Sequence, residues 1–283
     1  MQAVREAPLD SAIRTSPRHA NAGAPEHVPN PAARVAEPPT HVPLSRIQRL
    51  IGERMLASKH SKACFYLATR ADVTELMAIR HNLSKALGVK VTSNSFFVQA
   101  LALAATQYPL MVGRLVHLEG FPNADFCAGG PEPQDLLPTE VIQIPDHVNV
   151  GFAVNSPQGL VVPVIRQAEQ QTLADIAQQE KRLTDKARSN RLTLDDMEGM
   201  TVALSNLGAY DIDSFLGIVP PPVSTILTAG KVTPTPLPWN GHVIVRKRVS
   251  LSLAVDHRVV DSEYAARFLQ ALTQQLEDPQ RLV

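Results

Sequence analysis

A short segment near the C-terminus joins a predicted strand, a histidine and a predicted helix, and it constrains the fold more than any other part of the chain. Residues 249–255 alternate apolar and polar side chains over most of their length, which predicts a strand. The sequence Asp-His-Arg-Val-Val-Asp follows, and His257 is its second residue. Behind it, apolar residues at helical spacing predict a helix: Ala265, Phe268, Leu269 and Leu272.

His257 is therefore expected at the boundary between two elements, with the Asp261 carboxylate close enough in sequence to fold back toward its ring. A neutral imidazole near pH 7 can accept a proton, and a neighbouring carboxylate can orient it. This pattern indicates a general base.

A second segment, Leu-Ser-Asn-Leu-Gly at 204–208, follows a predicted strand over 201–205. Ser205 would close that strand, so its hydroxyl could point into a cleft and donate a hydrogen bond to an oxyanion. Asn206 is predicted to form the turn. A run of three prolines at 220–222 precedes another predicted strand at 225–229.

In this order, the segments resemble the S-N-x-G, P-P-x-x-A-I-L and D-H-R-x-x-D-G motifs of the dihydrolipoyl acyltransferases of 2-oxoacid dehydrogenase complexes. The resemblance runs from about Leu44 to Val283. It implies an α/β fold of the chloramphenicol-acetyltransferase type, with a mixed sheet and flanking helices. It also implies a homotrimer whose active sites lie between neighbouring subunits.

The resemblance implies a role for each candidate catalytic residue. His257 would be the general base and Ser205 the oxyanion donor. Asp261 would be a structural carboxylate that holds the turn through a buried ion pair with an arginine. Arg54 and Arg258 are both candidates for that arginine.

Two parts are predicted from composition. Residues 1–43 contain no Phe, Tyr or Trp and eight of the 23 prolines, so they are expected to form a disordered tail. Residues 44–283 would form the acyltransferase domain. Its other predicted helices cover about 46–55 after a Ser45 cap, 73–87 after a capping box of Asp72 and Glu75, 94–107 after a Ser93 cap, and 172–188. Its other predicted strands cover 65–73, 148–154, 160–165 and 242–255.

The charges balance, with 27 basic and 27 acidic residues, and this gives no basis for binding nucleic acid or an anionic membrane. The two cysteines, Cys64 and Cys127, are far apart and lack metal-ligand spacing. No signal peptide or membrane-spanning run is visible, so a cytoplasmic protein is expected. No tightly bound cofactor and no metal are predicted.

Two departures from the resembled family bear on function. Ser262 stands where the family usually has glycine, and the connection over residues 117–146 is long and rich in Pro and Gly. No lipoyl domain is visible. The favoured hypothesis is a stand-alone enzyme that moves an acyl group, acetyl by preference, from acyl-CoA to a small hydroxyl acceptor, as in tetronate-type biosynthesis.

Two alternatives remain. One is the dihydrolipoyl acyltransferase core of a 2-oxoacid dehydrogenase complex whose lipoyl domain lies on another chain. The other is a non-catalytic trimeric scaffold, against which the joint presence of Ser205, His257 and Asp261 argues.

Overall fold

A computed structural model describes residues 41–117, 140–157 and 159–282. The predicted tail, apart from residues 41–43, lies outside these residues, as does the 118–139 part of the long connection. The folded unit spans Leu44–Val283. None of the helices in the described ranges is long and apolar enough to cross a bilayer. The cytoplasmic location stays a prediction.

A six-stranded mixed sheet forms the centre of this unit. Strand β8 runs parallel to β4 and β9, and the remaining neighbours are antiparallel. The predicted α/β class with a mixed sheet is therefore confirmed. Across the sheet the order is β1 (Cys64–Asp72), β10 (His242–Asp256), β9 (Thr225–Trp239), β8 (Val202–Asn206), β4 (Val150–Phe152) and β7 (Val164–Ile165).

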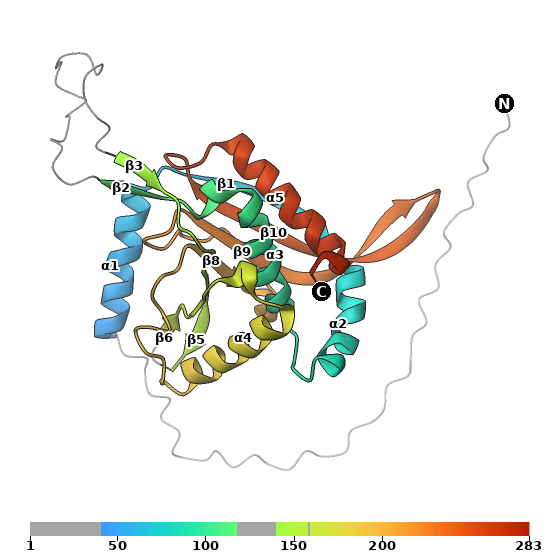
Figure 1. Ribbon diagram of the computed structural model, residues 1–283, viewed down its shortest axis with the longest axis horizontal. Coiled ribbons are helices and arrows are strands. Elements are labelled where there is room, and N and C mark those ends of the chain that lie inside the picture. The colour runs from blue at the N-terminus through green and yellow to red at the C-terminus, as the bar shows by residue number, and fades with distance from the viewer. Residues whose placement is uncertain (1–40, 118–139, 158, 283) are drawn as a thin grey trace, which may run out of the picture. The chain divides into compact units, whose positions relative to one another are not determined.

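Three helices, α3 (Ser93–Gln107), α4 (Leu173–Arg188) and α5 (Ser262–Glu277), cover one face of the sheet. Helix α3 packs between the other two, and Figure 1 shows α3 and α5 lying together over the strands. The sequence explains this arrangement, because α3 is apolar on nearly every side and is buried from Ser95 to Ala102. The main hydrophobic core lies between these helices and the sheet.

Helix starts follow local sequence signals, with two corrections. Helix α1 (Arg46–Ser61) begins after the predicted Ser45 cap, and α4 begins after Thr172 in a capping box. Helix α2 (Thr74–Ala86) has no side-chain cap, so the predicted capping box there is wrong. Its Asp72 instead accepts hydrogen bonds from N and Oγ1 of Thr74. Helix α3 is capped by Thr92 rather than by Ser93.

Strands β9 and β10 continue past the sheet as a long hairpin, which Figure 1 shows projecting from the domain. The predicted strand over 225–229 is therefore too short. Asn240 and Gly241 form the two-residue turn, both with positive φ. Three prolines alternate along β9 and oppose β10 residues in the register pairs Pro234↔Lys247, Pro236↔Val245 and Pro238↔Val243.

Two small ribbons complete the fold: β2 (Arg114–His117) with β3 (Glu140–Gln143), and β5 (Val154–Ser156) with β6 (Gly159–Val161). The hairpin predicted over 148–165 is thus divided, since its outer strands β4 and β7 join the main sheet. Short 3-10 turns lie at η1 (Pro109–Val112), η3 (Ala168–Gln170), η4 (Gly208–Tyr210) and η5 (Pro279–Leu282).

Candidate active site

His257 directly follows the last residue of β10, as its sequence predicts. Its backbone N–H donates to the carbonyl of Ala63, 2.9 Å away, at the start of β1. Its ring meets the Phe65 ring edge to face, with centroids 5.3 Å apart. The residue is otherwise exposed. The imidazole is thus backed by an aromatic ring and open to a substrate at the end of β10.

Asp256 and Arg258 flank this histidine and bind one another. The Asp256 side chain is 1% exposed and accepts hydrogen bonds from N, Nε and Nη2 of Arg258 at 3.2, 3.0 and 2.7 Å. Burial by itself would raise the pKa of Asp256, but the hydrogen bonds and charge of Arg258 outweigh it and lower that pKa. The carboxylate therefore stays ionised at neutral pH.

The backbone of the same turn is anchored on both sides. Asp256 N donates to the Ser224 carbonyl, and the Asp256 carbonyl accepts from Val259 and Val260. Together with the bond from His257 to Ala63, these contacts leave the histidine backbone little freedom. The ion pair and the turn hold His257 in one position without touching its ring.

The buried ion pair predicted for Asp261 does not form within the described residues of one chain. Asp261 is exposed and caps α5, its Oδ1 accepting from Tyr264 N at 2.8 Å. In the described parts of the chain neither Asp261 nor Arg54 forms an ion pair, and Arg258 pairs with Asp256. The strand register explains the difference, because Asp256 ends a buried strand whereas Asp261 opens a surface helix. Ser262 has no positive φ, so its backbone does not require glycine.

Ser205 lies near the end of β8 and is partly exposed. Alternation along the strand places it on the same face as Ala203, opposite the helices. Asn206 forms the turn as predicted, its Oδ1 accepting from Gly208 N at 2.9 Å. The turn packs tightly, since a Cβ added at Gly208 would lie 2.7 Å from the Gly230 carbonyl oxygen.

Ser205 and His257 do not meet within one chain. Ser205 is opposite Thr228, which is opposite Ser252, five positions before His257. At about 3.3 Å per residue and about 4.8 Å per strand, the two residues are about 19 Å apart. They lie toward opposite ends of the strands in the sheet. A site that uses both must take them from two chains.

Two further side chains stand beside the His257 turn. Burial lowers the pKa of Lys62, an effect that the Asp256 carboxylate partly offsets. Burial raises the pKa of the Cys64 thiol, and Asp256 raises it further. Cys64 is therefore an ordinary protonated thiol, as the sequence indicates, while Cys127 lies outside the described residues.

A cavity lies near each end of the central strands. One of about 670 Å³ lies beside the Ser205 turn and is bordered by Asn206, Gly208 and Glu180. Burial raises the pKa of Glu180 despite its hydrogen bonds with Ser95 and Thr92. The other cavity, of about 300 Å³, lies where β4, β8 and β9 begin, close to the end of β10. Sequence patterns predicted neither cavity, because their walls come from separate segments.

Comparison with known proteins identifies the family to which this fold belongs. The family model of the 2-oxoacid dehydrogenases acyltransferase (catalytic domain) matches residues 36–283. The chain belongs to this family. It is 32% identical over 84% of its length to the dihydrolipoyllysine-residue acetyltransferase component of the pyruvate dehydrogenase complex of Rickettsia bellii. It is 31% identical over 87% of its length to the succinyltransferase component of the 2-oxoglutarate dehydrogenase complex of Cupriavidus necator.

This acyltransferase domain spans about half the length of those two relatives, 52% and 55%. Among solved structures it is similar to the dihydrolipoamide acetyltransferase of Azotobacter vinelandii, with a TM-score of 0.75 and 30% identity. That match covers 90% of this chain and 98% of the solved chain. The predicted family resemblance is confirmed.

Proposed function

We propose that this chain transfers an acyl group between CoA and the thiol of a dihydrolipoyl group. His257 is the general base, Ser205 the oxyanion donor, and Asp261 supports the helix that follows the histidine. The second hypothesis from the sequence, a dehydrogenase-complex core, thus has more support than the favoured one. Acetyl and succinyl relatives match almost equally well, so the acyl group stays open.

One observation carries this proposal. Work on the Azotobacter enzyme concerned the catalytic role of a serine, a histidine and an asparagine, with the serine 52 positions before the histidine and the asparagine four after it. Here Ser205 precedes His257 by 52 positions and Asp261 follows it by four. The serine and histidine spacing is the same, and aspartate replaces asparagine.

The proposed chemistry uses only side chains already described. The acceptor sulfur attacks the thioester carbonyl as His257 takes its proton. The carbonyl oxygen becomes an oxyanion, to which the Ser205 hydroxyl donates a hydrogen bond. The carbon–sulfur bond to CoA then breaks, and the protonated His257 returns the proton to the departing thiolate. A new thioester and free CoA result.

The proposed assembly is a homotrimer. The distance of about 19 Å between Ser205 and His257 in one chain supports a site between subunits, because strand spacings do not allow them to meet otherwise. The resemblance to the acyltransferase cores implies the same arrangement.

A hydroxyl acceptor is the second candidate. It is favoured by the long connection between β2 and β3, because that ribbon lies beside the turn that contains His257. A Cβ added at Gly113, just before β2, would lie 3.4 Å from Val259. The same base can deprotonate an alcohol as it attacks.

The test is an acyl-transfer assay with acetyl-CoA and succinyl-CoA, offering dihydrolipoamide and a panel of hydroxylated metabolites. His257→Ala should lower turnover at least about a hundredfold, the usual worth of a general base. Ser205→Ala should lower kcat more than it raises KM. His81→Ala, on the exposed side of α2, is the control. Full activity in the His257 variant would refute the proposal, and transfer to alcohols alone would establish the second candidate.

A further inference from the structure

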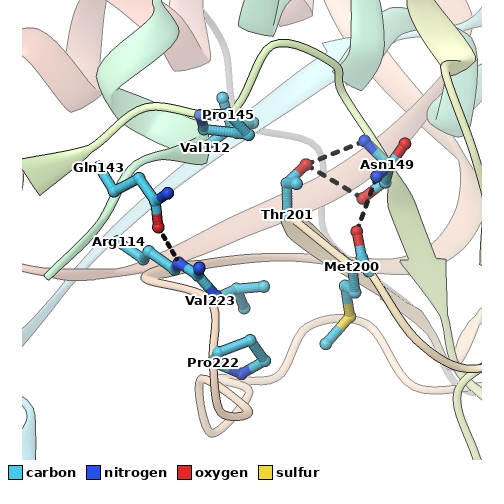
Figure 2. Close-up of a pocket in the computed structure, with 10 residues that line it drawn as sticks. Val112, Arg114, Gln143, Pro145, Asn149, Met200, Thr201, Pro222 and Val223 are labelled. Atoms are coloured by element: carbon cyan, nitrogen blue, oxygen red, sulfur yellow. Dashed lines mark hydrogen bonds between the residues drawn. The ribbon is translucent and has the colours of Figure 1, made fainter. Parts of the chain in front are cut away.

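The cavity beside the His257 turn has one charged side chain, that of Arg114, which Figure 2 shows beside Gln143 and Val223. We infer that this cavity binds the carboxylate of a small substrate through the Arg114 guanidinium. The inference rests on the proposed acyl transfer, and it adds a contact that selects the substrate.

Among the described residues, Arg114 makes one side-chain hydrogen bond, and its Nη groups have no partner. Its Nε donates to Gln143 Oε1 at 2.8 Å across the β2–β3 ribbon, which orients the exposed guanidinium. Within the described ranges Arg114 has no ion-pair partner. A planar guanidinium with its Nη groups unpaired is suited to a two-point contact with a carboxylate.

The polar side chains on the opposite wall, Asn149 and Thr201, already have hydrogen-bond partners. Asn149 Nδ2 donates to the Gly199 carbonyl at 2.7 Å, and its Oδ1 accepts from Gln167 N. Thr201 Oγ1 accepts from Asn149 N and donates to the Asn149 carbonyl (Figure 2). These groups therefore shape the wall rather than bind a ligand. The rest of the lining is mainly apolar: Val112, Pro145, Met200, Pro222 and Val223.

Residues on two sides of the cavity lie next to residues that contact the turn containing His257. Val223 precedes Ser224, whose carbonyl accepts from Asp256 N at 2.9 Å. On the other wall, Gly113 precedes Arg114, and a Cβ added at Gly113 would lie 3.4 Å from Val259. A substrate anchored at Arg114 is therefore held next to the proposed base.

Size and lining define the ligand class. A cavity of about 300 Å³ is at the lower end of the range for small-molecule sites. One cation among apolar groups fits a short carbon chain that ends in a carboxylate. Two substrates could supply it: an acyl group with a free carboxylate, such as succinyl, or an acceptor that is itself a carboxylic acid.

Binding tests the site without catalysis. Succinate should bind the wild-type full chain in calorimetry, and its monoamide should bind more weakly. Arg114→Met should weaken succinate binding about tenfold or more, in line with the loss of a charge-assisted hydrogen bond. Arg267→Met, on the exposed surface of α5, should bind it as the wild type does. Equal binding by the Arg114→Met variant and the wild type would overturn the inference.

Kinetics then separates the two sources. If the acyl group supplies the carboxylate, Arg114→Met should lower kcat/KM for succinyl-CoA about tenfold and leave acetyl-CoA unchanged. If the acceptor supplies it, the loss should follow acidic acceptors with either acyl-CoA. Arg114→Lys should restore part of the loss, since it keeps the charge without the planar fork. An equal loss with all substrates would refute carboxylate recognition, whereas a wild type without any transfer would refute the proposed function and leave the binding result standing.

Discussion

Arg258 Nη2 lies 2.7 Å from Asp256 Oδ2, and the two residues pair across His257, which stands between them in the chain. The carboxylate is buried, whereas the side chain of Arg258 is 39% exposed. The pair is therefore asymmetric. The buried Asp256 carboxylate depends on Arg258 for the hydrogen bonds that water no longer supplies, whereas water still reaches the Arg258 guanidinium.

This asymmetry predicts unequal effects of mutation. Arg258→Met leaves a buried carboxylate without its side-chain partner and should destabilise the fold by about 3 kcal/mol. Asp256→Asn leaves a half-exposed guanidinium that water can solvate, and it should cost about 1 kcal/mol. Urea unfolding of both variants measures the difference. A larger loss for Asp256→Asn would show that the aspartate is held by other contacts.

Activity should return when two inactive variants are mixed during assembly. If each site takes Ser205 from one chain and His257 from the next, random trimers of Ser205→Ala and His257→Ala chains contain about a quarter intact sites. Co-expression should thus give about a quarter of wild-type turnover, whereas either variant alone stays inactive. No recovery in verified mixed trimers would mean that the two residues do not share a site between chains.

Gly230 should tolerate no side chain. A Cβ there would lie 1.9 Å from the Asp213 carbonyl oxygen, so Gly230→Ala must displace the loop packed beside the Ser205 turn. Such overpacking costs typically about 1–3 kcal/mol, and activity should fall with stability. Gly52→Ala in α1 is the matched control, because nothing lies within 4 Å of its added Cβ. Thermal unfolding that ranks the two variants equally would contradict this view of the turn.

Asp196 should contribute stability that depends on pH. Burial alone would raise its pKa, but hydrogen bonds from Thr193 and Lys186 outweigh it and lower the pKa from 3.8 to about 2. The contribution is therefore complete above about pH 3.8 and is lost as the pH falls toward 2. Unfolding followed by circular dichroism between pH 5 and pH 2 should show less acid dependence in Asp196→Asn than in the wild type. An identical acid dependence in the variant would exclude this aspartate as the cause.

Removing residues 1–43 should leave the fold, the assembly and acyl transfer intact, since this segment has no large aromatic side chain to add to a core. Size-exclusion chromatography with light scattering, together with the transfer assay, checks this. Loss of assembly on truncation would show that the segment packs against the domain or a neighbour.

Local signals predicted much of the fold. Ser45 caps its helix as expected, because a capping residue and its partner lie three positions apart. The position of His257 at the end of a strand was equally readable, since the change from strand to helix spacing surrounds it. The Asn240-Gly241 pair was the missed sign of the long hairpin, and the prolines before it obscured the strand.

Contacts between segments far apart in the chain could not be predicted from the sequence. Asp256 and Asp261 both flank His257 in sequence, and only the strand register determines which of them is buried. The cavity at Arg114 likewise joins residues from the β2–β3 ribbon and from the starts of β4, β8 and β9. No spacing in the sequence marks such a site.

The prolines of the projecting hairpin have a consequence for solubility. Each proline sits opposite a β10 residue in a pair that exchanges no backbone hydrogen bonds. At such a position the backbone N–H of β9 would point outward from its free edge, and proline has no N–H there. An incoming strand would find no donors at 234, 236 or 238. The hairpin can therefore extend into solvent, apolar Val243 and Val245 included, without serving as a template for strand-by-strand aggregation.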